Sequence, residues 1–347
     1  MTESPLKLVG AYGSPYSRKL RAVLRYRRIA HRWIVRGSRE DHGIPEVPVA
    51  LIPVLVFPGL KDGPDGPDTA MIDSTFQIRR LEELERARSV VPPEPVMAFV
   101  DALIEDYADE WLTKAMFHYR WAFDPDIHKA AAILPRCART DAPEELMEAL
   151  GHGFSERQVG RLGVVGSNPT TASVIEASYR RLLRALDAQL RVQPFVMGAR
   201  PGTADFGLFG QLTQLALFDP TSQALALEEA PRVVAWCHGV EDLSGLEVTD
   251  ADWTSHEAVP ETLRALLAEV GRVYVPFLLA NAVALARGDA QVACEIDGRK
   301  WVQKPFPYQG KCLRWLREQY TALGSGDRSA VDALLAGTGC EALFTDV

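Results

Sequence analysis

Residues 9–29, VGAYGSPYSRKLRAVLRYRRI, decide the fold of the N-terminal part of this chain. The apolar residues before the turn at 14–17 are typical of a buried strand, and those after it recur at helical spacing. We therefore expect a strand over Leu6–Ala11 and a helix over Ser17–Ile29. Between them the turn SPYS places two serine hydroxyls, on either side of Pro-Tyr, at the N-terminal end of the helix.

The following sixty residues continue the pattern of a mixed α/β domain. Short apolar runs bounded by Pro or Gly predict further strands, and an apolar helical pattern predicts a second helix. The order β-α-β followed by β-β-α predicts an α/β domain over residues 1–88. The expected strands are His31–Val35, Val54–Phe57 and Ala70–Ile72, the expected helix is Ser74–Glu85, and the expected turn is Lys61–Asp68 (KDGPDGPD).

Beyond residue 88 the sequence changes character. Residues 89–96 contain three prolines that cannot continue a helix, so we interpret them as a linker. Apolar residues then recur at helical spacing, which predicts an all-α domain over residues 97–347. A hairpin with an Asp-Gly turn is expected at Ala293–Trp301. The expected helices are Met97–Trp121, Thr171–Val192, Thr203–Leu217, Val259–Arg287 (broken or kinked at Pro276) and Lys311–Leu323.

Composition limits the classes of function. The 347 residues carry a formal net charge of −8, so nothing attracts the whole chain to nucleic acid or to an anionic membrane. The basic residues between positions 18 and 32 are interpreted as the solvated face of a helix. The five cysteines are scattered, which favours a reducing compartment and predicts neither disulfides nor a metal site. The N-terminus lacks a secretory pattern and the longest apolar stretch, Val273–Ala280, is too short to cross a bilayer, so we expect a cytoplasmic protein without a membrane partner.

The turn SPYS resembles the active-site turn of the thioredoxin fold, in which glutaredoxins carry Cys-Pro-Tyr-Cys. Both sulfur atoms are replaced by oxygen here, and an alcohol cannot form a disulfide, so thiol–disulfide exchange through this turn is excluded. A serine followed by proline and an aromatic residue at a helix start is similar to the turn of the glutathione S-transferase superfamily. In that family the position of Ser14 meets the sulfur of glutathione.

Three further stretches extend the resemblance. Ile52-Pro53 precedes the third strand, where the family has a cis-proline, and Asp73-Ser74 starts the second helix, where the family has an acidic residue or glutamine followed by serine. Residues 198–206, GARPGTADF, resemble the turn into the core helix of the family's second domain. There Gly202 replaces the capping hydroxyl, and Asp205 can complete a capping box. The resemblance covers about 1–90, 97–125 and 171–245, and leaves segments at about 125–170 and 250–347 as additions.

The resemblance implies a two-domain enzyme that binds glutathione as a cosubstrate and needs no metal. It implies that the backbone of Ile52, before Pro53, pairs with the cysteinyl part of glutathione, and that Asp73 and Ser74 bind the γ-glutamyl part. Ser14 is then the group that stabilises the thiolate, because a hydroxyl donor and a helix N-terminus both favour the anion of a thiol whose free pKa is near 8.5. The thiolate attacks an electrophilic carbon of a hydrophobic small molecule, and a homodimer is also implied.

Several alternatives stay open at this point. Ser14 can act as a helix cap alone, in which case Tyr12 or Ser17 is the donor to the sulfur. His42 is a candidate for the glycyl carboxylate of glutathione. The same site suits a glutathione-dependent lyase, dehalogenase or isomerase, and a non-catalytic binding protein can keep the same scaffold. A set of aromatic residues is interpreted as core, with a pocket for the second substrate as the alternative: Trp111, Phe117, Tyr119 and Trp121.

Overall fold

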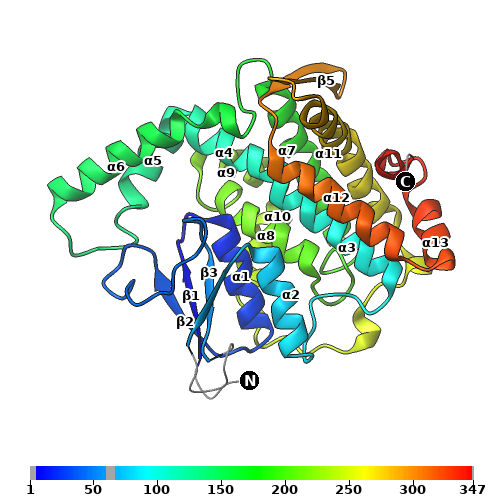
Figure 1. The fold of residues 1–347 in the computed structure, drawn as a ribbon, viewed down its shortest axis with the longest axis horizontal. Coiled ribbons are helices and arrows are strands. Elements are labelled where there is room, and N and C mark those ends of the chain that lie inside the picture. Colours follow the sequence, from blue (N-terminus) through cyan, green and yellow to red (C-terminus); the bar gives the residue numbers. More distant parts are fainter. Residues whose placement is uncertain (1–4, 60–66, 346–347) are drawn as a thin grey trace.

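The computed structural model describes residues 5–59 and 67–345. Its N-terminal part is a four-stranded sheet in the order β2-β1-β3-β4, in which β1 runs parallel to β2 and the other pairs are antiparallel (Figure 1). This is the β-α-β, β-β-α order that the sequence predicts. The turn expected at Lys61–Asp68 lies, apart from its last two residues, outside the described residues. The elements are β1 Leu6–Gly10, α1 Pro15–Tyr26, β2 His31–Val35, β3 Val54–Phe57, β4 Thr69–Ile72 and α2 Ser74–Leu84.

The two faces of the sheet are covered differently. Along β1, Leu8 belongs to the main core, whereas its neighbour Val9 belongs to a small apolar cluster on the opposite face. This alternation follows from the two-residue period of a strand. The small cluster is covered by Ile44 and Val47 from the long loop between β2 and β3. The other face, which carries α1 and α2, is therefore left to meet the helical part of the chain.

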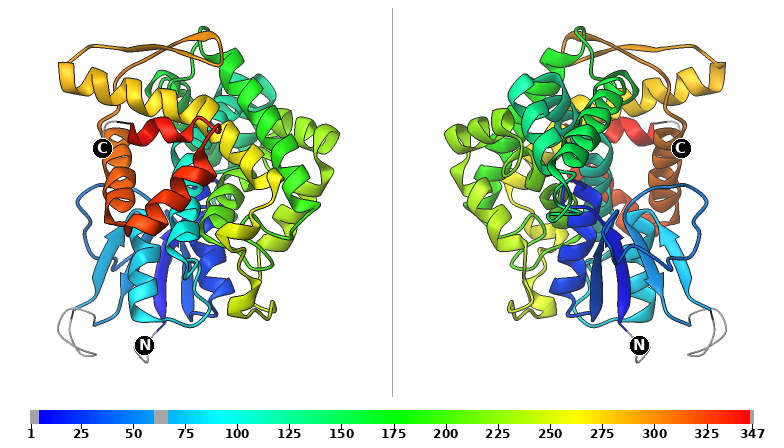
Figure 2. Two further views of the ribbon diagram at one scale, coloured as in Figure 1. Left: turned by 90° about the vertical axis from the view of Figure 1, so that its right-hand side faces the viewer. Right: turned by 90° about the vertical axis from the view of Figure 1, so that its left-hand side faces the viewer.

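The described residues after 94 form a helical assembly with one hairpin, as Figures 1 and 2 show. The expected α/β-plus-helical fold class is confirmed, whereas the proposed domain limits at 88, 96 and 97 stay a prediction. The helices are α3 Pro95–Tyr107, α4 Thr113–Ala122, α5 Asp124–Ile133, α6 Glu144–Val159, α7 Ala172–Leu190, α8 Thr203–Leu215, α9 Pro220–Glu229, α10 Pro231–Val240, α11 Glu261–Arg287, α12 Pro307–Ala322 and α13 Ser325–Leu335, and short 3₁₀ turns lie at Leu162–Val164, Asp250–Asp252, His256–Ala258 and Cys340–Phe344.

The helix expected over Met97–Trp121 changes its hydrogen bonding halfway. A π-helical segment, η1, covers Ala108–Leu112 between α3 and α4. Such segments are rare and frequently lie at functional sites. Three of the four aromatic residues interpreted as core from the sequence are so: Trp111, Tyr119 and Trp121 are each at most 2% exposed, whereas Phe117 is partly buried and packs against the core.

Helix α11 bears on two expectations. It is one helix of 27 residues with Pro276 inside it, so of the break or kink expected at Pro276 the break into two helices is excluded. The helix is also long enough to cross a membrane, and an 18-residue window of it, with a mean hydropathy of 1.4, is apolar enough. The apolar stretch Val273–Ala280 alone is too short for this. However, 61% of its most apolar window is buried within the structure. In this fold α11 therefore serves as a core helix.

The sheet part and the helical part meet where α1 packs against α8. At Gly210 the two helices approach so closely that a Cβ atom would lie 2.6 Å from the carbonyl oxygen of Pro15. The turn before α1 is also held by the helical part, because Arg120 donates to the carbonyl oxygen of Gly13 at 2.8 Å. Leu134, which follows α5, packs against the same glycine. Two segments of the helical part thus hold Gly13, the residue before the turn SPYS.

The turn into α8 is capped in an unexpected way. Asp205 accepts a hydrogen bond from Gly202 N at 3.0 Å, as the capping box predicts. The place of the missing hydroxyl at Gly202 is filled by Asp101 of α3, which lies 2.3 Å from where a Cβ atom would stand. The Asp101 carboxylate accepts from the backbone N–H of Thr203 and of Ala204. A side chain from another helix therefore replaces the local cap.

The last hundred residues fold back over the molecule. The predicted hairpin is present as β5 Val292–Ile296 and β6 Arg299–Gln303, with Asp297 and Gly298 both at positive φ in its turn. Helix α12 then packs along α3, as does α13 (Figures 1 and 2). This path brings α12 beside the start of α2, where the ring of Trp315 meets that of Phe76 at a centroid distance of 5.1 Å.

Candidate functional site

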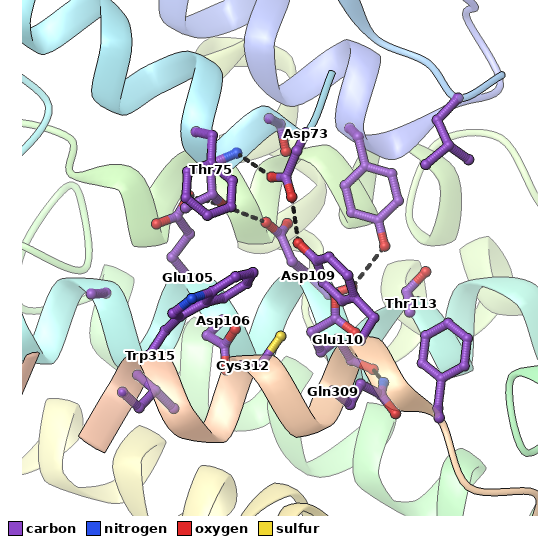
Figure 3. Close-up of a pocket in the computed structure, with 18 of the residues that line it drawn as sticks. Asp73, Thr75, Glu105, Asp106, Asp109, Glu110, Thr113, Gln309, Cys312 and Trp315 are labelled. Atoms are coloured by element: carbon purple, nitrogen blue, oxygen red, sulfur yellow. Dashed lines mark hydrogen bonds between the residues drawn. The ribbon is translucent and has the colours of Figure 1, made fainter. Parts of the chain in front are cut away.

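A cavity of about 520 Å³ lies between the sheet part, the α3–η1–α4 segment and α12. Figure 3 shows the α3–η1 side chains on one side of it and those of α12 on another. The sheet part contributes the residues around β3 and the start of α2. The residues that line the cavity include Tyr16, Ile52, Pro53, Asp73, Ser74, Thr75, Glu105, Asp106, Asp109, Glu110, Lys114, Tyr308, Gln309, Cys312 and Trp315.

The four residues predicted to bind glutathione line this one cavity. The Ile52–Pro53 peptide bond is cis, as expected. The carbonyl oxygen of Pro53 accepts a hydrogen bond from Gln77 Nε2 at 3.0 Å, which ties the start of β3 to α2. Asp73 and Ser74 stand at the N-terminus of α2 on the same side. The structure therefore brings together residues that are twenty positions apart in the sequence.

Asp73 holds the start of α2 in a strained conformation. Its φ of 76° is unusual for a residue with a side chain and costs on the order of 1–3 kcal/mol. Its Oδ1 accepts a hydrogen bond from Thr75 N at 3.2 Å, and its Oδ2 accepts one from Tyr308 OH at 2.5 Å. Backbone strain of this kind is concentrated at functional sites. Asp73 is thus both the cap of α2 and the contact between the sheet part and α12.

The hydroxyls of the turn SPYS have different surroundings. Ser14 caps α1, since its Oγ accepts a hydrogen bond from Ser17 N at 3.3 Å, and its own proton remains available for a ligand. Ser17 is fully buried and accepts from Ala11 N. Tyr16 alone of the four residues lines the cavity, with its OH donating to the carbonyl oxygen of Asp109 at 2.8 Å. The role of Ser14 at the sulfur stays a prediction.

The two other alternative residues lie away from the cavity lining. Tyr12 is 36% exposed and its ring packs edge-on against Trp33. His42 is exposed on the loop between β2 and β3. Arg39 on the same loop pairs with Asp141, between α5 and α6. The structure therefore does not bring His42 or Tyr12 together with the cavity residues.

Four carboxylates from the α3–η1 segment form one wall of the cavity: Glu105, Asp106, Asp109 and Glu110. All four are shown in Figure 3. Lys19 of α1 pairs with two of them, at 2.6 Å to Glu105 Oε1 and 2.5 Å to Asp109 Oδ2. Thr75 Oγ1 also donates to Glu105, at 3.1 Å. Because these groups are buried, their ion pairs and hydrogen bonds govern how the wall is charged.

Burial raises most of the pKa values in this wall. It raises the pKa of Asp106 to about 7 and that of Asp109 to about 6. Burial, with the charges of Asp106 and Asp109, raises the pKa of Glu110 to about 8. Burial acts in the same direction on Glu105, but the Lys19 ammonium outweighs it and holds the pKa of Glu105 below its ordinary value. Three of the four carboxyls therefore titrate around neutral pH.

Helix α12 supplies the third side of the cavity. Besides the Tyr308 hydrogen bond to Asp73, Gln309 Nε2 donates to the carbonyl oxygen of Glu110 at 3.1 Å. Trp315 packs edge-on against Tyr308, at a centroid distance of 5.8 Å. Burial raises the pKa of the Cys312 thiol well above its usual range, so this cysteine is not a thiolate nucleophile. The C-terminal segment thus closes the cavity without adding a reactive group.

Sequence reasoning missed the acidic wall and the side formed by α12. A signal for the wall was present, because the stretch EDYADE at 105–110 repeats its acidic residues at i, i+1, i+4 and i+5, which places them on one helix face. The other faces of that helix are apolar, which leaves no solvated side for four charges. No local pattern marks Tyr308 or Gln309 as partners of residues more than 190 positions away.

The sheet order, the cis-proline before β3 and the serine-capped α1 packed on a helical part define the class of two-domain, thioredoxin-like transferase folds. Comparison with family models gives two matches: "Glutathione S-transferase, N-terminal domain" over residues 8–89, and "Glutathione S-transferase, C-terminal domain" over residues 138–239. Together they account for just over half of the chain, and the chain belongs to the glutathione S-transferase superfamily. The hairpin, α11, α12 and α13 lie beyond the second match.

Similar solved structures include three glutathione S-transferases. A Tau class enzyme from mango, Mangifera indica, is 19% identical with a TM-score of 0.41, over 76% of this chain and 97% of that one. An enzyme from Rhodospirillum rubrum is 16% identical with a TM-score of 0.41, over 73% and 98%. Rice GST1, solved in complex with glutathione, is 18% identical with a TM-score of 0.41, over 71% and 93%. A search of curated proteins gave no match.

Proposed function

We propose that this protein binds glutathione in the cavity and joins it, through its thiol sulfur, to an electrophilic carbon of a hydrophobic small molecule. The observation that carries the proposal is that Ile52, cis-Pro53, Asp73 and Ser74 line one cavity, which the helical part closes on the other side. Membership of the glutathione S-transferase superfamily supports it. The cavity is large enough for a small-molecule ligand, since such sites range from about 300 to 1,000 Å³.

The chemistry of the lining fits the parts of glutathione. The ladder of β3 begins at Val54, so the backbone of Ile52 lies outside it and is available to pair with the cysteinyl residue. Ser74 and the N-terminus of α2 suit the γ-glutamyl carboxylate, because the first turn of a helix presents N–H groups and a positive dipole end. The Asp73 carboxylate suits the γ-glutamyl ammonium group.

Ser14 is the proposed partner of the sulfur. Its Oγ already accepts the capping hydrogen bond from Ser17 N, so its proton can be donated to a thiolate at the N-terminus of α1. Lowering a thiol pKa by about two units requires roughly 2.7 kcal/mol of preferential anion binding, which one charge-assisted hydrogen bond and a helix terminus supply. The thiol proton goes to solvent, an S–C bond forms, and the leaving group departs with the electron pair of its bond to carbon.

Thermal shift measurements with millimolar glutathione test the proposal. Glutathione should raise the melting temperature of the wild type, and Ser74→Ala should reduce that rise. Ser14→Ala should retain much of the rise but lose the ultraviolet absorbance of the bound thiolate. Ser325→Ala is the matched control, because Ser325 is the first residue of α13, as Ser74 is of α2, but is exposed, whereas Ser74 is buried. If the wild type shows no rise, the protein is not a glutathione enzyme.

Product analysis separates transfer from related chemistry at the same site. A thioether of glutathione that accumulates as the leaving group is released indicates transfer. Glutathione that is unchanged after turnover indicates an isomerase, and glutathione released from a supplied thioether indicates a lyase.

A further inference from the structure

The acidic wall of the cavity contains one carboxylate, that of Glu110, that has no ion-pair partner among the described residues. Glu105 and Asp109 pair with Lys19, and Asp106 accepts a hydrogen bond from Tyr274 OH at 2.6 Å. The carboxylate of Glu110, by contrast, forms no ion pair and no hydrogen bond of normal geometry within residues 5–59 and 67–345, and the Gln309 side chain lies close enough to lower its pKa slightly. Glu110 is only 9% exposed, and a buried acid without an ion-pair partner destabilises the folded state when it ionises.

A second unpartnered acceptor comes from a different element. Gln309 of α12 lines the cavity, is only 2% exposed, and uses its Nε2 to donate to the carbonyl oxygen of Glu110. Its Oε1 has no donor among the described residues, and the same is true of Asp109 Oδ1. Figure 3 shows Gln309 beside Glu110 at this end of the cavity. Once Glu110 is ionised, this end therefore offers acceptors from η1 and α12 that have no hydrogen bond of normal geometry from the described residues.

The cations that line the cavity do not supply those donors. Lys114 Nζ donates to Val165 O at 3.1 Å and to Gln303 Oε1 at 3.2 Å, and lies 4.2 Å from the ring centroid of Phe277. Arg79 lies over the ring of Phe76, and Arg161 is exposed. None of the three forms an ion pair with Glu110 in the described part of the chain. The excess of acceptors is therefore left for a ligand.

We propose that the second substrate carries a primary ammonium group on an apolar body, and that the ammonium binds between Glu110 and Gln309. A primary ammonium supplies three N–H donors and one positive charge, which matches acceptors that are both unpartnered and acidic. The rings of Tyr308 and Trp315 on α12 form an apolar wall that suits the rest of the molecule and attracts a cation. This inference rests on the proposed function, because it names the substrate class for the same cavity.

Binding of the ammonium also releases a proton. In the empty cavity burial raises the pKa of Glu110 to about 8, so the carboxyl is mostly protonated at pH 7 and ionises when the cation arrives. Such release distinguishes a charge pair from simple filling of the cavity. The charged and titratable groups that act on Glu110 or line its end of the cavity are Asp106, Asp109, Lys114, Tyr16, Tyr274, Tyr308 and Cys312.

Isothermal titration with phenethylamine and its neutral counterpart phenethyl alcohol tests the inference, first without and then with saturating glutathione. The amine should bind wild type at least about tenfold more tightly than the alcohol, and its binding heat at pH 7 should depend on the ionisation enthalpy of the buffer. Glu110→Gln should abolish both the preference and the buffer dependence. Glu148→Gln, an exposed change of the same kind on α6, should leave both unchanged.

Two outcomes would overturn the inference: equal affinities for amine and alcohol, or a preference that persists in Glu110→Gln. The variant is expected to fold, because it replaces an unpartnered acid by a neutral group of similar shape. Gln309→Met provides a second variant, which should weaken amine binding severalfold and leave alcohol binding unchanged. The amine titration without glutathione is independent of the glutathione thermal shift, so failure of the inference and failure of the proposed function are distinguishable.

Discussion

Replacing Glu110 by Gln should stabilise the protein by an amount that depends on pH. Burial and the neighbouring Asp106 and Asp109 charges raise the pKa of Glu110 from 4.5 to about 8. In the unfolded chain this carboxyl ionises near its ordinary value, so the folded state loses stability as pH rises from 4.5 to about 8 and then levels off. A pKa shift from 4.5 to about 8 corresponds to a loss of at most roughly 5 kcal/mol in the free energy of unfolding. The amide keeps the shape of the side chain and removes its charge, so Glu110→Gln recovers part of that free energy.

The assay is the thermal midpoint of wild type and Glu110→Gln at about pH 4.5 and about pH 8.5. Near pH 4.5 the thermal midpoint of Glu110→Gln should exceed that of wild type only slightly. At that pH the raised pKa of Glu110 destabilises the wild type by less than about 0.5 kcal/mol. Near pH 8.5 the midpoint should rise by several degrees, since one kcal/mol moves it by about 2–4 °C in a domain of moderate size. A lower midpoint near pH 8.5, or an equal gain at both pH values, would refute the reasoning.

Glu105→Gln is the matched control for this measurement. Glu105 lies on the same helix and undergoes the same chemical change, but it pairs with Lys19 at 2.6 Å. Its removal leaves the Lys19 ammonium with one partner in a buried site, so the midpoint near pH 8.5 should fall. Opposite signs for two similar substitutions on one helix show that pairing, and not the loss of a carboxylate in general, controls the effect.

Three further changes test the packing around the site. Lys19→Met leaves the buried carboxylates of Glu105 and Asp109 unpaired and should destabilise the protein by about 3–5 kcal/mol. The loss should be smaller at low pH, where these carboxylates are protonated, and thermal midpoints across pH measure it. Gly210→Ala places a Cβ atom 2.6 Å from a carbonyl oxygen of α1 and should destabilise the protein by about 1–3 kcal/mol. Gly239→Ala, on an open face of α10, should instead stabilise the protein by up to about 1 kcal/mol. Unfolding by denaturant measures both changes. Tyr308→Phe removes the hydrogen bond to Asp73 and should lower stability by about 1.5–3 kcal/mol in the same assay.

The N-terminal fold was predictable because its signals are local. The strands at His31–Val35 and Val54–Phe57 are bounded by turn residues and agree with the structure. The first helix was predicted over Ser17–Ile29, but it begins at Pro15 and ends at Tyr26, so both of its predicted ends lie too far along the chain. The helical core was predicted in outline for the same reason. Of the break or kink expected at Pro276, the break is wrong, because tertiary burial holds α11 together across a residue that disfavours a helix.

The candidate site was predictable only on its sheet side. Ile52-Pro53 and Asp73-Ser74 belong to short motifs, so a resemblance at those positions is sufficient to find them. The acidic wall and α12 depend on contacts between distant segments, such as the Tyr308–Asp73 hydrogen bond across 235 positions. Lys19 illustrates the limit, because in the sequence it is one of several basic residues on a helix interpreted as solvated. In the structure it is 1% exposed, and its ion pairs with Asp109 and Glu105 raise its pKa against the effect of burial.

The energetic cost of the acidic wall is itself an argument about function. A buried carboxylate without a partner destabilises the folded state, and replacement by a neutral group of similar size is often stabilising. Lys19 offsets this cost for Glu105 and Asp109. Burial lowers the pKa of Lys114, the basic group whose charge acts on Glu110, to about 7, and Lys114 directs its hydrogen bonds toward Val165 and Gln303 instead. A group that weakens the fold yet faces a cavity is most simply explained by what it binds, which here must bring donors and positive charge.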